Sequence, residues 1–241
     1  MNYKKKIVFI ITALFALILI TSCSELKLTE QMQAGVDVYI EAVSKHANKT
    51  AGKIKVISVS DDSAIEFKST KSVIECEYTV NDGNVIYTRT DYLDGKKTSE
   101  YQCDGESVMC LVAGSSDWVD KTEENAVFLS ADTNPLTTLS LFRVDNDFQV
   151  RTDYLTDIQY NSQPDENGYV TVRFTLKDST VSNVLSYNKV KGIVRSSAGH
   201  TRTYYIDGDG DIAKIVVSAV QKILNNGKEG YYTTEITVLC E

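Results

Sequence analysis

The chain of 241 residues carries 25 Lys and Arg against 33 Asp and Glu, so its formal net charge of -8 argues against the basic surface that nucleic-acid binding requires. With 42% hydrophobic and 24% charged residues, it has the composition of a globular protein rather than of a disordered chain. Its 14 tyrosines and only 2 prolines favour strands over a proline-rich stalk, and the length suits one β-rich domain or two small ones.

Residues 1–22 have the features of an export signal. Lys4, Lys5 and Lys6 form a basic segment, and an uncharged, mostly apolar run of 14 residues from Ile7 to Ile20 follows. A helix needs roughly 20 apolar residues to cross a bilayer, so this run is too short for a permanent anchor. We therefore expect it to be cleaved.

The next residues, Ile20, Thr21, Ser22 and Cys23, resemble the lipobox of bacterial lipoproteins. This resemblance implies that diacylglycerol is joined to the Cys23 thiol, that cleavage occurs before Cys23, and that the protein is held at the extracytoplasmic face of the cell membrane. Residues 23–28 would then be a lipidated N-terminus with a short tether. The alternatives are an ordinary signal peptide that contains a cysteine and a signal anchor that is not cleaved.

Removal of residues 1–22 takes away three lysines and leaves 22 basic against 33 acidic residues, a net charge of -11. Anionic lipid surfaces repel such a chain, so the anchor has to be the lipid itself. Each buried CH₂ of an acyl chain contributes about 0.8 kcal/mol to membrane binding. Two acyl chains, for example two palmitoyl chains, therefore hold a protein in the membrane far more firmly than one.

From Thr29 to about Ala47, apolar residues recur every three or four positions, which predicts one helix with Thr29 as its N-cap. After Gly52 the period changes to that of strands. Short runs are separated by turn sequences at Asn81-Asp82-Gly83, Leu93-Asp94-Gly95-Lys96 and Asp104-Gly105, which predicts an antiparallel meander.

In the second half of the chain, Asn134-Pro135 predicts the start of a second helix over 135–143. Strands are expected near 148–160 and at 169–177, and then at 201–207, 211–223 and 230–240. Residues 180–187 fit a short helix or another strand.

This order of elements predicts a single α+β domain over 29–241: a curved antiparallel sheet, or half-open barrel, with the N-terminal and mid-chain helices packed on its concave face. In element order and turn spacing it resembles the LolA/LolB/LppX type of exported lipoprotein domain. That resemblance implies a space between sheet and helices that can hold acyl chains. It carries no individual binding residue across.

Reactive motifs are few, and each has a simpler explanation. Asp207-Gly208-Asp209-Gly210-Asp211 begins like a calcium loop but has Ile212 where Gly is needed and Ser218 where Glu is needed, so we expect a hairpin turn. Short matches to serine-enzyme motifs occur at 186–189 and 97–99, in the wrong order. Acidic pairs such as Glu75 with Glu77, or Glu123 with Glu124, are expected on solvated surfaces.

No zinc, haem or nucleotide motif occurs in the sequence, so we expect no cofactor and no metal. The chain has two histidines. His46 lies in the last helical turn and His200 in a predicted turn at 197–200, and both are expected to be exposed.

With Cys23 assigned to lipid, Cys76, Cys103, Cys110 and Cys240 remain, an even number that allows two disulfides in three connectivities. We expect a bridge, with Cys76 to Cys240 and Cys76 to Cys103 among the candidate pairs. Free, half-buried thiols are the alternative.

These features lead to three hypotheses. The first is a lipid-anchored, non-enzymatic protein that shelters a lipid or other apolar ligand in a cavity under the helix at 135. The second is a scaffold domain with a filled core and an exposed aromatic patch around Tyr87, Tyr92 and Tyr101. The third, an exported hydrolase, would need Ser186 or His200 in a cleft with a base and an acid.

Overall fold

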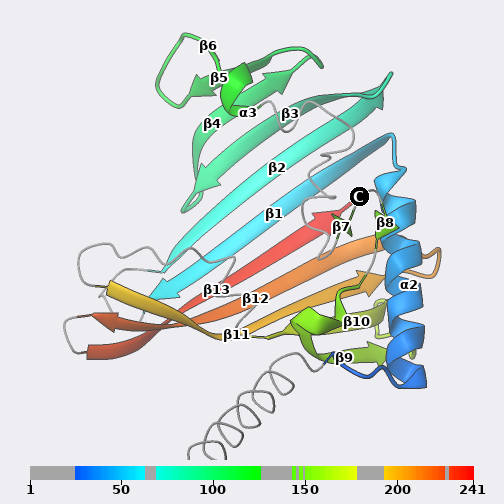
Figure 1. The fold of residues 1–241 in the computed structure, drawn as a ribbon. Coiled ribbons are helices and arrows are strands. Elements are labelled where there is room, and N and C mark those ends of the chain that lie inside the picture. Colours follow the sequence, from blue (N-terminus) through cyan, green and yellow to red (C-terminus); the bar gives the residue numbers. More distant parts are fainter. Residues whose placement is uncertain are drawn as a thin grey trace, which may run out of the picture.

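The computed structural model describes residues 25–62, 69–125, 143–144, 147–148, 150–177, 193–225 and 228–241. Its described part contains one long helix, α2 (Glu30–Ala47), and one antiparallel sheet of eleven strands (Figure 1). The strands of this sheet are β1 (Ala51–Asp62), β2 (Thr70–Asn81), β3 (Asn84–Leu93), β4 (Lys96–Cys103), β5 (Val108–Val112), β6 (Val119–Asp120), β9 (Leu155–Asn161), β10 (Val170–Leu176), β11 (Ile193–Ile206), β12 (Ile212–Asn225) and β13 (Lys228–Cys240). The smaller elements are α3 (Thr122–Asn125), β7 (Arg143–Val144), β8 (Asp147–Phe148) and the 3₁₀ turn η3 (Thr152–Tyr154).

Helix α2 forms where its caps and apolar stripe predict it. The Thr29 hydroxyl accepts a hydrogen bond from the Met32 amide at 3.2 Å and so satisfies one of the free N–H groups of the first turn. Glu30 lies in the first turn and Lys45 in the last, which suits the helix dipole. The predicted helix and its N-cap are therefore confirmed.

The sheet consists of two meanders joined in the middle. Its order is β6-β5-β4-β3-β2-β1-β13-β12-β11-β10-β9, so the strand that follows α2 lies beside the last strand, with Ile54 opposite Cys240. We call β1–β6 the first wing and β9–β13 the second wing. The turn between β2 and β3 has Asp82 and Gly83 at positive φ (50° and 84°), as a two-residue hairpin turn requires.

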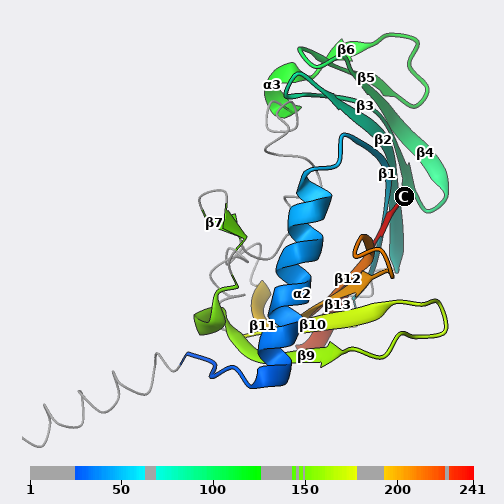
Figure 2. The same ribbon diagram turned by 90° about the vertical axis from the view of Figure 1, so that its right-hand side faces the viewer.

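The sheet curves around α2 (Figure 2). We call the face that α2 contacts the inner face and the opposite one the outer face. Helix α2 lies mainly over β9 and β10 and contacts β12 as well. At this junction Tyr39 makes edge-to-face contacts with Phe174 and Tyr204, with ring centroids 4.9 and 4.7 Å apart. All three side chains are fully buried, so the second wing has a packed core.

The predicted fold class, an α+β domain with a curved, open antiparallel sheet, is confirmed. Strand β11 begins earlier than predicted, at Ile193, and a single strand covers 51–62. The predicted helix at 135–143 and the ambiguous segment at 180–187 lie outside the described residues. Within the described residues, no helix combines the length and apolarity needed to cross a bilayer.

Candidate functional site

The inner face of the first wing carries apolar side chains with one charged pair among them. Antiparallel pairing sets Ile54 opposite Cys76, Cys76 opposite Arg89, Arg89 opposite Tyr101, and Tyr101 opposite Cys110. Directly opposed residues point to the same face, so this row lies on the same side as the buried Ile54. The parallel row beside it holds Tyr78, Tyr87, Cys103 and Val108, all buried.

Arg89 and Asp91 form the charged pair. The two residues are two apart on β3 and therefore share the inner face. Nε and Nη2 of Arg89 donate to the two carboxylate oxygens of Asp91 at 2.7 and 2.8 Å. The Arg89 side chain is 24% exposed and that of Asp91 is 18% exposed. This bidentate geometry fixes the guanidinium in one plane.

Tyr101 contacts the same guanidinium through the face of its ring. The Arg89 Cζ lies 4.8 Å from the centre of the Tyr101 ring. Burial works against the charged form of Arg89, but the hydrogen bond and negative charge of Asp91 raise its pKa above the ordinary value. Burial likewise raises the pKa of Tyr101. Arg89 therefore remains charged on this half-buried surface.

The remaining cysteines, Cys76, Cys103, Cys110 and Cys240, are all free, so the expected bridge is wrong and the alternative of free thiols holds. Cys76 and Cys240 lie on opposite sides of Ile54, two strands apart, and β3 likewise separates Cys76 from Cys103. Two strand spacings amount to about 9.5 Å. A disulfide requires Cα atoms within about 7 Å, so neither pair can bridge without moving the backbone.

The free cysteines act as small apolar side chains. Burial raises the pKa of Cys76 to about 11 and that of Cys240 to about 12, which keeps both in the thiol form near neutral pH. Thiols of this kind are poor nucleophiles. They add apolar surface to the inner face rather than reactivity.

Both histidines differ from the prediction that they are exposed. His46 is 4% exposed, and neither ring nitrogen has a hydrogen-bond partner. It points inward because it continues the stripe of Tyr39 and Val43 at spacings of four and three residues. Burial, followed by the charge of Lys49, lowers its pKa to about 4. His200 lies in β11, not in a turn, and burial lowers its pKa to about 4 as well.

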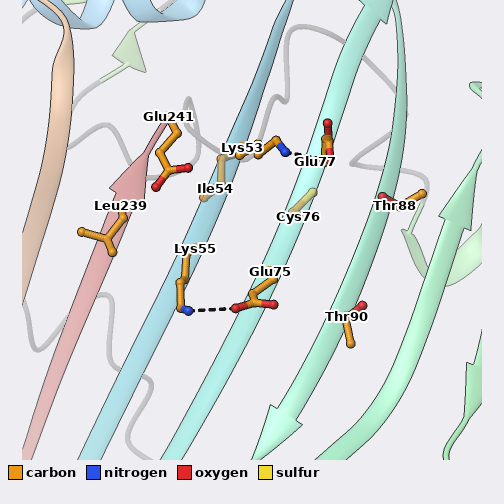
Figure 3. A pocket seen from close by; sticks show the side chains of 10 residues that line it. All are labelled: Lys53, Ile54, Lys55, Glu75, Cys76, Glu77, Thr88, Thr90, Leu239 and Glu241. Carbon is orange, nitrogen blue, oxygen red and sulfur yellow. Dashed lines mark ion pairs between the residues drawn. The ribbon is translucent and has the colours of Figure 1, made fainter.

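A groove of about 400 Å³ lies on the outer face of the first wing and extends to Leu239 and Glu241 at the end of the chain. Figure 3 shows the side chains that line it. The charged side chains that β1 and β2 contribute to this groove are paired across the two strands. Lys55 Nζ lies 2.8 Å from Glu75, and Lys53 Nζ lies 3.4 Å from Glu77. These side chains are 45–64% exposed. The acidic pair of Glu75 and Glu77 is thus bound in surface ion pairs, as expected for a solvated strand face.

In the acidic turn before β12, the carboxylates of Asp207 and Asp211 form hydrogen bonds and ion pairs within the protein. The Asp207 side chain accepts hydrogen bonds from the amides of Asp209 and Asp211 at 3.0 and 2.9 Å. Asp211 in turn pairs with Lys45 and Lys49 of the α2 end at 3.1 and 3.4 Å. The run is a hairpin turn, as predicted, and its contact with the end of α2 is a finding of the structure. Across the described residues, no group of three or more potential ligands is arranged for a metal.

The aromatic patch expected around Tyr87, Tyr92 and Tyr101 does not form. Tyr87 is 6% exposed, and Tyr87 and Tyr101 both face inward. Tyr92 pairs with Val73, one residue out of phase with the inner row, and so points to the outer face. Lys97 of the serine-enzyme match makes an ion pair with Glu100, while Ser186, Lys189 and Cys23 lie outside the described residues.

The fold defines a class of protein with a large open sheet wrapped around one helix. No family model matches the chain, and no curated protein matches it. Among solved structures it is similar to the lipoprotein LppX of Mycobacterium tuberculosis, with 11% identity over 87% of this chain and 94% of that one and a TM-score of 0.49.

A LolA superfamily protein from Nitrosomonas europaea matches with 10% identity over 88% of this chain and 94% of that one, at a TM-score of 0.27. A DUF1329 family protein from Desulfovibrio piger matches with 10% identity over 86% and 92%, at a TM-score of 0.24. These matches include the type of domain that the sequence resembles. At such identities the likeness concerns the fold and assigns no ligand.

Proposed function

We propose that the protein is an exported lipoprotein, anchored through Cys23 at the extracytoplasmic face of the cell membrane, that binds a lipid or other apolar ligand without catalysing a reaction. The ligand site is the inner face of the first wing. The observation that carries this proposal is the apolar character of that face beyond the reach of α2.

The two wings differ in how their inner faces are covered. In the second wing, Tyr39, Phe174 and Tyr204 fill the space beneath α2. In the first wing, the described residues provide only the single turn α3, which contacts β5. Half-buried apolar side chains there, such as Val56 and Cys76, pack against the core without being part of it. A ligand therefore has its place over the first wing.

A filled-core scaffold is the alternative function, and the side-chain directions disfavour it. Its expected aromatic patch is directed inward at Tyr87 and Tyr101. Of the exposed large apolar residues that the structure describes, Val59, Ile86 and Tyr231 lie on β1, β3 and β13. Val112 and Val119 lie on the neighbouring strands β5 and β6, at the edge of the sheet. Single exposed apolar residues are ordinary on a protein surface.

The test is whether the full chain carries a bound apolar molecule. The chain should be expressed with its signal, extracted in mild detergent and analysed by native mass spectrometry after detergent removal in the gas phase. We expect an adduct with the mass of a cellular lipid, in addition to the covalent lipid on Cys23. A matched variant, Cys76→Arg, places a charge on the inner face, where it should abolish the adduct, whereas Thr88→Arg on the outer face should retain it. Wild-type protein without any adduct would contradict the proposal.

A further inference from the structure

The Arg89–Asp91 pair is the charged group that interrupts the apolar inner face of the first wing at the place proposed for the ligand. Its neighbours across the strands are Cys76 and Ile74 on β2 and Tyr101 and Ser99 on β4. A half-buried ion pair is a costly element on such a face, because two charges lose hydration there. Lys55 and Glu75 form a comparable pair on the outer face, where water remains in contact with both.

Part of the guanidinium remains available for a ligand. Nε and Nη2 are directed at Asp91, and the ring of Tyr101 fixes the plane. Among the described residues, Nη1 of Arg89 has no hydrogen-bond acceptor, yet it is not a fully enclosed atom. It therefore presents two N–H donors of fixed direction on the inner face.

We infer that Arg89 and Asp91 form a head-group subsite, which selects an amphiphile with an uncharged carbonyl oxygen in its head over one with a free carboxylate. The inference rests on the proposed function and names the chemistry of its ligand. An ester or amide carbonyl accepts from Nη1 without adding a charge. A carboxylate in the same place would meet the negative charge of Asp91 a few ångströms away.

The charge of the whole chain acts in the same direction. The net charge of -11 without residues 1–22 adds a repulsion of anions, which salt screens. Asp91 neutralises the guanidinium through two hydrogen bonds, so Arg89 supplies directed donors rather than an uncompensated positive charge. Selection between head groups therefore depends on Asp91 as much as on Arg89.

The test compares two ligands with the same acyl chain, monoolein and oleate. The full-length chain is placed in phosphatidylcholine nanodiscs near neutral pH, and binding of each labelled ligand is measured after subtraction of empty nanodiscs. We expect the wild type to bind monoolein at least about tenfold more tightly than oleate, because both head groups can accept from Nη1 but only the carboxylate of oleate meets the negative charge of Asp91.

Asp91→Asn is the informative variant, because its affinity for oleate is expected to increase. Loss of the carboxylate leaves Arg89 with an uncompensated charge, so oleate affinity should rise by about tenfold while monoolein affinity stays within about threefold. A misfolded protein cannot produce this gain. Glu75→Gln is the matched control, since it removes the same charge from the outer-face pair and should leave both affinities unchanged.

Three results would overturn the inference: equal affinity of the wild type for both ligands, no gain of oleate binding in Asp91→Asn, or an equal gain in Glu75→Gln. In each of these cases the proposed apolar site still stands, provided that monoolein binds. Failure of the wild type to bind either ligand would instead contradict the proposed function itself.

Discussion

His46 is the residue whose placement has the clearest consequence for stability. Its neutral ring is buried on the inward side of α2 without a hydrogen-bond partner, and burial lowers its pKa in the folded state to about 4 from an ordinary value of 6.5. The unfolded chain therefore binds a proton more readily than the folded one. Stability that is intact above pH 6.5 is lost progressively as the pH falls toward 4.

We predict that His46→Leu removes this pH dependence. When the pH falls from about 7.5 to about 5, protonation of His46 in the unfolded chain should lower the unfolding free energy of the wild type by about 2 kcal/mol. The drop in the unfolding free energy of the variant should be smaller by that amount. Urea unfolding at the two pH values measures the difference. The pKa of His200 is lowered as well. In a double variant, His46→Leu/His200→Leu, the carboxylates are then the groups that make stability depend on pH.

Those carboxylates act in a separate pH range. Burial opposes ionisation of Asp211, yet hydrogen bonds and charge from Lys45 and Lys49 lower its pKa below 3.8. Its contribution to stability is present above that value and disappears only below it. An equal loss of stability in His46→Leu and wild type between about pH 7.5 and about pH 5 would show that His46 is not the group responsible.

The burial of His46 could be predicted from the sequence, whereas the face of the sheet on which Arg89 lies could not. Position 46 follows Tyr39 and Val43 at helical spacing, which marks it as a buried position, but the residue type suggested a charged group at the helix end. Arg89 lies in a strand of alternating polar and apolar residues. Only its pairing with Cys76 and Tyr101 shows which of the two faces it occupies.

At the scale of elements, the contact between α2 and the sheet depends on one close approach. A Cβ at Gly35 would lie 2.7 Å from the Cβ of Tyr160 on β9, closer than real side-chain carbons approach. Gly35 is buried on α2, and Gln31 nearby donates a hydrogen bond to the Tyr160 carbonyl at 3.0 Å. The helix therefore meets the sheet edge with no space for a methyl group.

We predict that Gly35→Ala destabilises the protein by about 1–3 kcal/mol, although alanine favours a helix by about 1 kcal/mol over glycine. The overlap with Tyr160 should exceed that gain and push α2 away from β9. Gly208→Ala is the control, because nothing lies within 4 Å of its Cβ position. Thermal or urea unfolding measures both variants. A Gly35→Ala protein as stable as the wild type would contradict the close contact.

The elements differ in how well their sequences predict them. The hairpin at Asn81-Asp82-Gly83 is encoded locally, because Asp and Gly tolerate the positive φ that its turn needs. The pairing of β1 with β13 joins residues far apart in the chain, and no local pattern specifies such a partner. The failed disulfide prediction has the same cause. Cysteine spacing in the sequence gave no indication that a whole strand separates each proposed pair.

At the scale of the whole molecule, the proposed anchor and the folded body are joined by very little chain. Leu26 and Leu28 pack against the core, and the Leu26 amide donates to the Thr152 carbonyl at 3.3 Å. Lipid attached at Cys23 would therefore hold the body by about three residues, or about 10 Å of extended chain. The domain would lie close to the membrane surface rather than at the end of a long flexible linker.

We predict that Cys23→Ala releases the protein from the membrane without unfolding it. Labelled palmitate should be incorporated into the wild type and not into the variant. Because the net charge of -11 provides no electrostatic attraction to anionic lipids, the wild type should also resist extraction by high salt. Cys76→Ala is the control, and it should keep both the label and the attachment. Equal labelling of Cys23→Ala and wild type would contradict the proposed lipid site.

The central position of β13 also constrains the order in which the molecule can be assembled. Until residues 228–240 are available, β1 and β12 each present an open edge, and the two meanders have nothing to join them. The eleven-stranded sheet is therefore completed only when this segment pairs with both neighbours. If the chain is exported as proposed, the joining of its two wings would be left to the far side of the membrane.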